Sequence, residues 1–370
     1  MEKNLSWADK VKQAAPKSKP CEPCRKKNRI TVVADMTPVV NVIPVIPVYN
    51  EADRLEATLR HLLCGNVLHD IVVVDDMSTD GCAQRCMRNW EWKRLERNGR
   101  VTIKRGTLIH FIREGRRGVG GSRQVGGDLA FKLGATTAFF LDSHVAVNPY
   151  DVVGCAELAE ARTAIVQPCC LGWHVSGTAK RYGGNLGWHE RRILGVGYVK
   201  RRPPPEDPGW ITPDLLKVKG LIGANGYAVP KVVWDKIDGW STECGMWGFN
   251  EQLISTKAFF GNIPLLCDTT RSSRHYFKSS KKGEGLKIDS TGYWFSRWAV
   301  LRYLFSESTF KNVWLPLLKT RFCNTTLWEM VNNPKLLAAR DKYLPMRERT
   351  EVEWFQEFLP HKPKVWEGKP

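Results

Sequence analysis

The sequence predicts an α/β fold, a doubly wound mixed sheet followed by a helical C-terminal appendage. Between residues 39 and 280, short β-branched runs alternate with segments of helical periodicity, as strands and helices do in such a sheet. Beyond residue 281, aromatic residues are frequent and several apolar positions recur at helical spacing. We therefore expect a basic N-terminal arm at 1–38, an α/β domain at 39–280 and an aromatic-rich helical region at 281–370.

The first strands and helices follow one another closely. A strand is expected at 39–48, where Pro44 and Pro47 favour a position near a strand end or a sheet edge. Leucines at helical spacing predict a helix at 55–63, and four consecutive β-branched residues at 71–74 predict a parallel core strand. The next expected elements are a helix at 82–97, a strand with its core at 107–112, a flexible basic loop at 113–121 and a helix at 122–133.

The apolar run 138–141 lies between a glycine and an Asn-Pro pair, which favours a buried strand. It leads into Asp142 and His144, whose side chains should project to the same side because side chains alternate along a strand. A carboxylate and an imidazole that converge at a strand end suit a divalent cation. For this stretch alone, an ordinary polar turn after a strand is the alternative.

Beyond residue 151 the pattern is less regular. Residues 173–213 are rich in Gly, Trp, Arg and Pro, which is more typical of a substrate-handling loop than of scaffold. The remaining expected elements are a helix at 156–164, a strand at 164–168, a return to the sheet at 221–229, a helix at 231–237, a helix reaching residue 260 and a strand at 263–268. Ligands of doubly wound sheets bind beyond the carboxyl ends of the strands, where Glu51, Asp76, Arg116 and Asp142 fall.

The composition is that of a globular protein with an excess of positive charge. Lys and Arg number 56 against 38 Asp and Glu, which gives a net charge of +18. Such an excess favours nucleic acid, nucleotides or anionic membrane surfaces as partners, and a solvated basic surface is the alternative. The sequence has no run of roughly 18 apolar residues and its N-terminus lacks the apolar core of a secretory signal, so we expect a cytoplasmic protein without a membrane span.

Eleven cysteines in a chain without a secretory signal suggest reduced thiols. Cys21 and Cys24 form a CxxC pair, which is half of a zinc site, and Cys82 and Cys86 are the candidates for the other half. A lone CxxC pair does not by itself predict zinc.

Seven motifs occur in order between residues 42 and 278. They are Val48-Tyr49-Asn50-Glu51-Ala52, Val74-Asp75-Asp76-Met77-Ser78, the glycine-rich stretch 118–127 with Arg123, Leu141-Asp142-Ser143-His144, the stretch 223–229, Met246-Trp247-Gly248 with Asn250-Glu251, and Arg274-His275-Tyr276-Phe277. Together they resemble the glycosyltransferases of the GT-A fold, closest to the polypeptide N-acetylgalactosaminyltransferases and their family-2 relatives. The resemblance covers nearly two thirds of the chain and implies the transfer of a sugar from a UDP-sugar.

The resemblance also implies a metal site. Asp142 and His144 look like the Asp-x-His metal ligands of the family, and His275 looks like the third ligand. Carboxylate and imidazole ligands beside a diphosphate suit Mn²⁺, or another divalent cation of similar preference, better than Mg²⁺. Without the upstream pair, His275 beside two aromatic residues would more often be a core histidine.

A nucleotide pocket follows from the same resemblance. Asp76 looks like the residue that accepts a hydrogen bond from uracil, although Asp75 and Asp76 alone are also typical of a helix cap. Tyr49 would lie near the base, where the family usually has His, and Arg116, or Arg113 in another alignment, would face the nucleotide. The further nucleotide-binding candidates in these motifs are Glu51, Gly118 and Ser143.

Trp247, Asn250 and Glu251 stand where the family closes its sugar pocket, and we take them as the catalytic candidates. The family's Gly-Glu-Asn order is Phe-Asn-Glu here, which leaves the donor sugar open. The closest branch retains the configuration of the sugar, whereas an inverting enzyme would need a general base, for which Glu251 is the candidate. The alternative for Trp247, as for Trp188, is a place in the core.

The acceptor is inferred from charge and aromatic content. Golgi members of the family carry a membrane anchor and a lectin domain, of which this sequence shows no sign, so a secreted peptide is not expected. Lys and Arg neutralise phosphates and aromatic rings stack on bases, so Trp188, Arg191 and Arg192 are candidates for the acceptor site. We expect a hydroxymethylated pyrimidine in DNA, flipped from the duplex, as in relatives that modify viral DNA such as that of a bacteriophage. The alternatives are a peptide, polysaccharide or lipid-linked acceptor, and a non-catalytic nucleic-acid-binding protein on a transferase scaffold.

Overall fold

The structure of the chain is a computed structural model. It describes residues 40–82, 85, 100–104, 107–113, 115–172, 180–189, 192–199, 202–222, 225–245, 247–276, 290–319 and 325–359. The predicted arm at 1–38, with Cys21 and Cys24, and most of the helix predicted at 82–97 lie outside these residues. The division of the chain at residues 38 and 280 stays a prediction.

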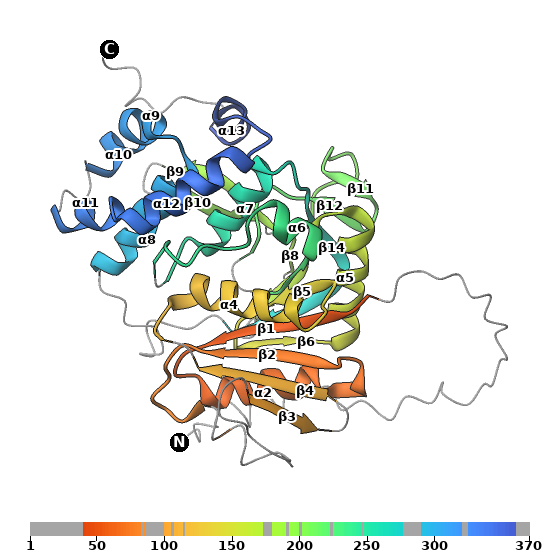
Figure 1. Ribbon diagram of the computed structural model, residues 1–370. Helices are drawn as coiled ribbons and strands as arrows, with labels where there is room; N and C mark the ends of the chain where they lie inside the picture. The colour runs from red at the N-terminus through yellow and green to blue at the C-terminus, as the bar shows by residue number, and fades with distance from the viewer. Residues whose placement is uncertain are drawn as a thin grey trace, which may run out of the picture.

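A large mixed sheet lies at the centre of the molecule (Figure 1). Its strand order is β11 (Trp210–Thr212), β12 (Leu215–Lys217), β14 (Leu265–His275), β7 (Ile165–Gly172), β13 (Tyr227–Pro230), β5 (Thr137–Phe140), β1 (Val42–Val48), β2 (Asp70–Asp75), β4 (Thr107–Arg113) and β3 (Arg100–Lys104). In addition, β6 (Val145–Val147) pairs with β14 and β8 (Lys180–Arg181) pairs with β7. Strands β5, β1, β2 and β4 are parallel, whereas β3, β13 and β12 run antiparallel to their neighbours, so the predicted mixed sheet is confirmed.

Helices pack on both faces of the sheet. Alternate residues of β1 and β2 enter two separate cores, Val45 and Val72 on one face and Ile46 and Val73 on the other. The first core is shared with α4 (Gly118–Lys132), α6 (Lys231–Lys236) and α7 (Asn250–Phe260), and the second with α2 (Ala52–Leu62) and α5 (Pro149–Arg162). This two-sided arrangement is the doubly wound architecture that the alternation of elements predicts.

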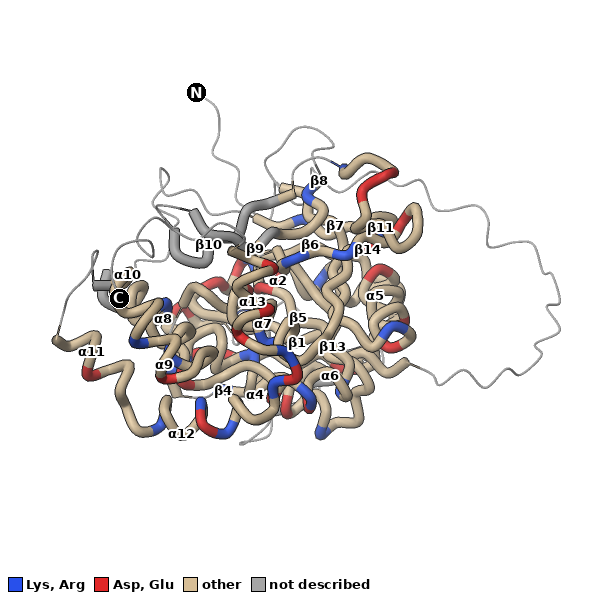
Figure 2. The backbone as a smooth tube through the Cα atoms, turned by 90° about the horizontal axis from the view of Figure 1, so that it is seen from above, with Lys and Arg blue, Asp and Glu red and all other residues tan. Residues whose placement is uncertain are grey.

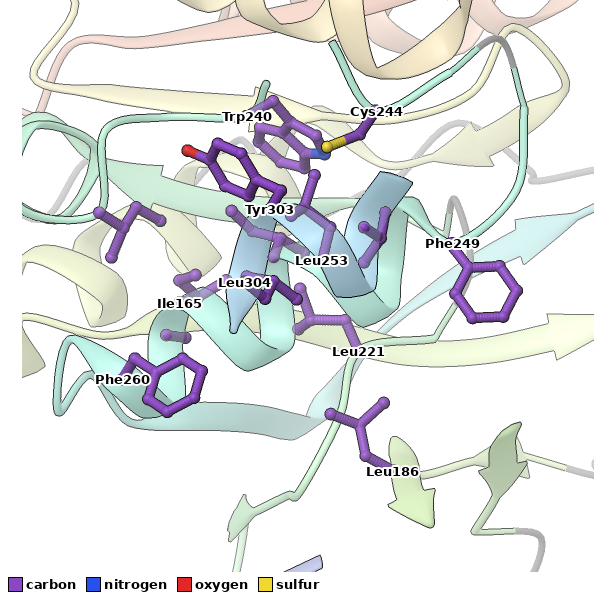
Figure 3. Packing of buried hydrophobic residues seen from close by; sticks show 14 of the residues in the cluster. Ile165, Leu186, Leu221, Trp240, Cys244, Phe249, Leu253, Phe260, Tyr303 and Leu304 are labelled. Atoms are coloured by element: carbon purple, nitrogen blue, oxygen red, sulfur yellow. The ribbon is translucent and has the colours of Figure 1, made fainter. Parts of the chain in front are cut away.

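The C-terminal region is helical, as predicted, and docks on the first core. Figure 3 shows Leu253 of α7 in the same cluster as Tyr303 and Leu304. The helices are α8 (Ser290–Leu304), α9 (Glu307–Thr309), a π-helical turn (Phe310–Trp314), α10 (Leu315–Lys319), α11 (Thr325–Val331), α12 (Pro334–Tyr343) and α13 (Glu351–Phe358). Among the described residues, no helix has the length and apolar character needed to cross a membrane.

Of the two positions that the prolines of β1 favour, the sheet edge is wrong, whereas Pro47 does lie next to the strand end at Val48. β1 lies between β5 and β2, pairs with β5 through its first half and with β2 through its second half, and the two paired stretches share Val45. The backbone oxygen of Val45 accepts a hydrogen bond from the β5 side and that of Val48 accepts one from the β2 side. Since alternate residues face alternate neighbours, Pro44 faces β2 before that pairing begins and Pro47 faces β5 after that pairing ends. Neither missing N–H interrupts a ladder.

Helix α4 begins at Gly118, inside the stretch that was predicted as a flexible loop at 113–121. The carboxylate of Asp76 accepts hydrogen bonds from the first amides of this helix and so replaces the missing side-chain cap. Gly126 lets the helix approach the sheet closely, because a Cβ there would lie 2.4 Å from Cγ1 of Val45. The glycines that resemble a loop therefore belong to a helix packed tightly on β1.

Several elements extend beyond their predicted bounds. Helix α5 begins at Pro149 rather than at 156, with the side chain of Asn148 as its N-cap. Strand β7 ends at Gly172 rather than at 168, and β14 ends at His275 rather than at 268. The stretch 173–213, predicted as a loop, contains β8, β11 and a separate two-stranded sheet of β9 (Gly184–His189) and β10 (Arg192–Tyr198). Strand β6 was not predicted.

Candidate active site

Sheet pairing brings the three predicted metal ligands together. Strand β6 follows Asp142 and His144 directly and pairs with the end of β14, with Val145 opposite His275. The backbone N–H of Tyr276 donates to the backbone oxygen of His144 at 3.1 Å. His275 is therefore held beside the Asp-x-His turn by backbone hydrogen bonds, although it lies far away in the sequence.

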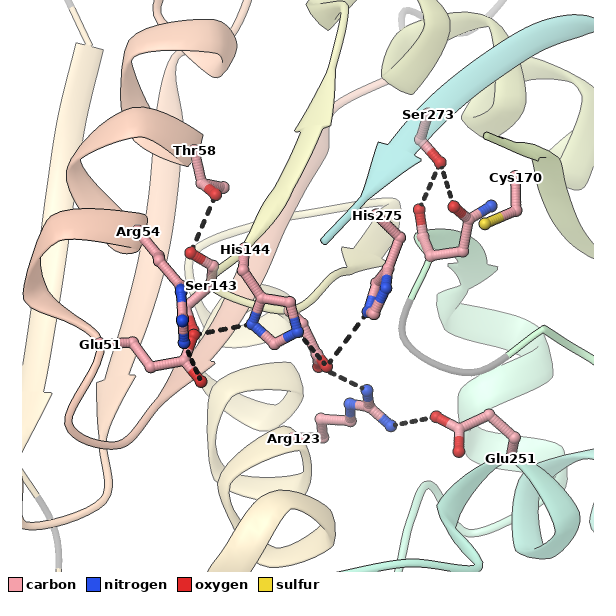
Figure 4. Close-up of polar contacts among 12 residues, drawn as sticks. Glu51, Arg54, Thr58, Arg123, Ser143, His144, Cys170, Glu251, Ser273 and His275 are labelled. Carbon is pink, nitrogen blue, oxygen red and sulfur yellow. Dashed lines mark hydrogen bonds and ion pairs between the residues drawn. The ribbon is translucent and has the colours of Figure 1, made fainter. Parts of the chain in front are cut away.

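Asp142, His144 and His275 form the group of metal-ligating side chains that the described part of the chain contains. One ligand atom from each lies within 4.8 Å of the others. Oδ2 of Asp142 is 3.7 Å from Nε2 of His144 and 4.0 Å from Nε2 of His275, and the two imidazole rings meet edge to face (Figure 4). One carboxylate oxygen and two imidazole nitrogens on a common point fit a first-row divalent cation such as Mn²⁺.

Glu51 fixes the orientation of His144 from behind. Its Oε2 lies 2.7 Å from Nδ1 of His144 and accepts a hydrogen bond from Oγ of Ser143 at 3.0 Å. A carboxylate against Nδ1 favours the tautomer that carries its proton there, which leaves the lone pair of Nε2 directed toward Asp142. Glu51 and Ser143, both taken as nucleotide-binding candidates from the sequence, thus lie buried behind the metal ligand.

Arg123 connects the metal ligands with the catalytic candidate Glu251 (Figure 4). The fully buried guanidinium donates from Nη2 to Oδ1 of Asp142 at 3.0 Å and from Nη1 to Oε1 of Glu251 at 3.1 Å. The sequence marked Arg123 only as part of a motif and gave it no role. Its signal was present, since a buried arginine needs carboxylate partners, but the partners come from two distant elements.

The electrostatics of the site favour metal-binding protonation states. Burial raises the pKa of Asp142, but the neighbouring imidazole of His275 and the charge of Arg123 outweigh it and hold that pKa below its ordinary value. Burial lowers the pKa of His275, against the opposing effect of Asp142. Asp142 is therefore ionised and His275 neutral near pH 7, and these are the forms that ligate metals.

The other predicted nucleotide residues, Tyr49, Asp76, Arg116 and Gly118, lie together near the start of α4. Oδ2 of Asp76 accepts a hydrogen bond from Nη1 of Arg116 at 2.7 Å, and its Oδ1 accepts one from the backbone N–H of Arg117 at 2.6 Å. The guanidinium of Arg116 stacks on the ring of Tyr49, with Cζ 3.4 Å from the ring centroid. Burial raises the pKa of Asp76 more than the hydrogen bond from Arg117 and the charge of Arg116 lower it.

One pocket joins the metal end to the nucleotide end. Most of its lining residues are candidates from the sequence. The lining consists of Pro47, Val48, Tyr49, Asp76, Arg116, Gly118, Val119, Ser122, Asp142, His144 and Trp247. Arg113 is not among them, because its Nη2 donates to the backbone oxygen of Ser78 at 3.2 Å.

The sugar-pocket candidates lie at the rim of this pocket and at the start of α7. Trp247 is 41% exposed and lines the pocket. Asn250 is the first residue of α7 and its Nδ2 donates to the backbone oxygen of Gly248 at 3.4 Å. Glu251 directs Oε1 to Arg123, so this segment is tied to the metal ligands through a single buried cation.

The acceptor candidates are only partly described. Trp188 lies on β9 and Arg192 on β10, where Arg192 stands opposite His189. Arg191 lies outside the described residues. Their roles stay predictions.

Comparison with known proteins agrees with this geometry. Residues 45–201 match the family model described as glycosyl transferase family 2. This stretch of the chain is therefore similar to the glycosyltransferases of family 2. The family-2 match includes Asp76, Asp142 and His144 and ends before Trp247 and His275. No curated protein sequence matches the chain.

The fold can be compared with that of solved structures. A crystal structure of GalNAc-T7 with UDP, GalNAc and Mn²⁺ has a TM-score of 0.63 and 16% identity, covering 88% of this chain and 57% of that chain. The chain thus spans little more than half the length of GalNAc-T7, and the likeness identifies the GT-A fold. TarS 1-349 of S. aureus with UDP-GlcNAc has a TM-score of 0.45 and 14% identity, covering 70% of this chain and 65% of that chain. PcManGT, a mannosyltransferase of Pyrobaculum calidifontis solved with GDP-Man and Mn²⁺, has a TM-score of 0.43 and 16% identity, covering 92% and 86%.

Proposed function

We propose that the chain is a metal-dependent glycosyltransferase that moves a sugar from a UDP-sugar to a hydroxyl group of an acceptor. The observation that carries this proposal is the pocket that has Asp142 and His144 at one end and Tyr49, Asp76 and Arg116 at the other. A nucleotide sugar has its diphosphate between its base and its sugar. Its base would therefore lie beside Tyr49, Asp76 and Arg116, and its diphosphate beside Asp142 and His144. The GalNAc-T7 structure, solved with UDP, GalNAc and Mn²⁺, supports the choice of donor and metal.

The residues present fit the proposed metal, since Asp142 supplies a carboxylate oxygen and His144 and His275 supply imidazole nitrogens. A bound Mn²⁺ supplies charge neutralisation for the leaving diphosphate. The chain's own part is to hold these groups in place: Glu51 orients His144, and Arg123 holds the carboxylates of Asp142 and Glu251. Such fixed dipoles and charges stabilise a developing charge without reorganisation during the reaction.

A donor screen tests the reaction. The purified chain is incubated with Mn²⁺ and UDP-glucose, UDP-N-acetylglucosamine or UDP-N-acetylgalactosamine, and UDP release is measured with and without EDTA. We expect at least one donor to give UDP release that EDTA abolishes. Release that EDTA leaves unchanged would contradict the metal, and no release from any UDP-sugar with any acceptor class would contradict the function.

We further propose that the acceptor is a hydroxymethylated pyrimidine in DNA. The net charge of +18 and the aromatic-basic stretch 173–213 support an anionic acceptor with bases to stack on. Most of the positive excess lies outside the described residues, and Figure 2 shows acidic and basic residues mixed along the described elements. The proposed DNA contacts therefore include the arm 1–38 and the stretch around 200, where basic residues outnumber acidic ones.

Matched DNA duplexes test the acceptor. The UDP-release assay is run with duplexes that contain cytosine, thymine or their hydroxymethylated forms, and DNA affinity is measured at two salt concentrations. We expect release that depends on hydroxymethylated DNA and an affinity that falls steeply with salt. Release stimulated instead by a peptide, polysaccharide or lipid-linked acceptor would contradict the DNA acceptor and keep the transferase. Salt-dependent DNA binding without turnover of any donor would favour the non-catalytic alternative.

A further inference from the structure

Helix α8 of the C-terminal region packs directly on the segment that carries the sugar-pocket candidates. Gly245 has a φ of +93°, and a Cβ at this position would lie 2.3 Å from Oγ of Ser296 on α8. Two residues later, the ring of Trp247 lies 6.3 Å from that of Tyr293, which is also on α8. A helix outside the family-2 match therefore forms the support for the rim of the pocket.

Arg297 lies at the centre of this contact. It is only 5% exposed, and its guanidinium carbon lies 4.4 Å from the ring centroid of Phe249, 4.8 Å from that of Tyr293 and 5.0 Å from that of Trp294. Its Nη2 also donates to the hydroxyl of Tyr293 at 2.8 Å. A planar cation that faces three rings and is hydrogen-bonded to one of them fixes their relative positions.

Phe249 transmits this position to α7. It precedes the first residue of α7 and has a φ of +61°, a left-handed conformation that is strained for a bulky side chain. Such a conformation persists only where the surroundings hold it, and Phe249 is 4% exposed with Arg297 over its ring. Phe249 is flanked by Trp247 on one side and by Asn250 and Glu251 on the other. The position of Phe249 therefore determines the positions of Trp247, Asn250 and Glu251.

We propose that Arg297 is a positioning residue for sugar transfer, which holds Trp247, Asn250 and Glu251 in place through Phe249 and Tyr293. The effect of Arg297 on sugar transfer rests on the proposed function, whereas its effect on the position of residues 247–251 does not. In this role α8 is part of the active site, and the C-terminal region helps to determine the shape of the sugar pocket. The metal triad, in contrast, is held chiefly by the pairing of β6 with β14 and by Glu51 and Arg123.

Three variants separate positioning from general stability. Arg297→Met removes the charge and the planar group, Arg297→Lys keeps the charge alone, and Tyr293→Phe removes only the hydroxyl that accepts the hydrogen bond. Arg302→Met is the matched control, because Arg302 is also on α8, is 3% exposed and lies over the ring of Phe310, but contacts Glu307 and Asn332 rather than the rim segment. If Arg297→Met does not fold, Arg297→Lys and Tyr293→Phe give the decision.

The first readout is hydrogen–deuterium exchange of residues 247–253. We expect faster exchange there in Arg297→Met, a smaller increase in Arg297→Lys and in Tyr293→Phe, and no increase in Arg302→Met. The second readout is kinetic. We expect kcat of Arg297→Met to fall by about 10²-fold, as for a misplacement of about 1 Å, with an unchanged Kd for Mn²⁺ and a partial recovery in Arg297→Lys.

The two readouts fail in distinguishable ways. Exchange at 247–253 that matches the wild type in a folded Arg297 variant, or that rises equally in Arg302→Met, overturns the positioning role. Faster exchange in the Arg297 variants together with a wild-type chain that turns over no donor supports the positioning contact and overturns the proposed function instead.

Discussion

At the metal end of the pocket the side chains are attached to paired strands and backed by buried charges, whereas at the nucleotide end an exposed arginine connects two turns. His144 directly precedes β6 and His275 pairs with Val145 of β6, and Glu51 and Arg123 are buried behind them. The side chain of Arg116 is 38% exposed and holds Tyr49 and Asp76 together from the solvent side. The proposed metal end is therefore held by more buried contacts than the proposed nucleotide end.

This difference ranks the expected effects of substitution. A group that is buried, paired and in contact with the proposed metal has no substitute, so its loss should affect turnover most. A group that is exposed to solvent contributes less, because water competes for its partners. The predictions below run from the largest effect to the smallest. The failure of any one of them would change the comparison between the two ends of the pocket or the ranking of effects.

Asp142→Asn should have the largest effect on activity. It removes the anionic ligand, and a loss of about 4 kcal/mol of charge stabilisation corresponds to about a 10³-fold fall in turnover. The matched control is Asp70→Asn, because Asp70 also pairs with a histidine, Oδ1 to Nε2 of His110 at 2.7 Å, but stands at the first residue of β2. Steady-state UDP release is the measurement, and full activity in Asp142→Asn would remove the metal assignment.

Glu51→Gln should lower metal affinity without unfolding the protein. The amide keeps the shape of the side chain but weakens the hold on Nδ1 of His144, and the loss of such a supporting carboxylate costs between about 10- and 100-fold in metal affinity. Titration of Mn²⁺ by calorimetry measures the effect. Glu56→Gln on the same helix is the control, since Glu56 pairs with Arg60 at the surface, and an equal loss in both variants would contradict the role of Glu51.

Arg116→Ala should affect the donor alone. We expect KM for the UDP-sugar to rise roughly fivefold, which is about 1 kcal/mol for a partly exposed ion pair and ring contact, with kcat unchanged. Arg113→Ala is the control, because that arginine bonds to a backbone oxygen outside the pocket lining. A larger rise in Arg113→Ala than in Arg116→Ala would reverse the assignment of the two arginines.

The smallest effect concerns the stability of the C-terminal region. Burial would raise the pKa of Glu307, but hydrogen bonds from Arg302, Arg340 and Lys311 outweigh it and lower the pKa from 4.5 to about 2. The stabilisation is therefore present above pH 4.5 and is lost as the pH falls through about 2. Glu307→Gln should lower Tm at pH 7 by no more than about 2 °C, because the group is exposed. The two melting curves should converge toward pH 2, and a gap that widens there would contradict the sign.

The sequence predicted the parts of the fold that local pattern determines. The β-branched runs of β1 and β2 and the apolar run of β5 are buried on both faces of the sheet, and the leucines of α2 bury one face of that helix. Local composition and spacing therefore identify each of these elements. β6 has only three residues, and it forms because the end of β14 provides its partner. The sequence does not show that strand end, because residues 269–274 are polar without an apolar alternation. Residues 269–271 fall in a register shift, and the pairing of β14 with β7 resumes at Ser272.

The candidate site shows the same limit. Asp142 and His144 were found from adjacent positions in the sequence, and His275 from its motif. The places of Glu51 behind His144 and of Arg123 between two carboxylates follow from contacts between distant elements. The sequence shows that these residues are charged, but it does not show which carboxylates are buried or which charged groups they contact. The support of Trp247 by α8 had no motif at all.

The most direct test of the proposed metal end is electron spin-echo envelope modulation of Mn²⁺ bound to the full chain in the presence of UDP. Nitrogen-14 couplings from two imidazoles are expected in the wild type, from His144 and His275, and from one imidazole in His275→Ala. A spectrum without imidazole nitrogen, or one that His275→Ala leaves unchanged, would contradict the assignment of the three ligands.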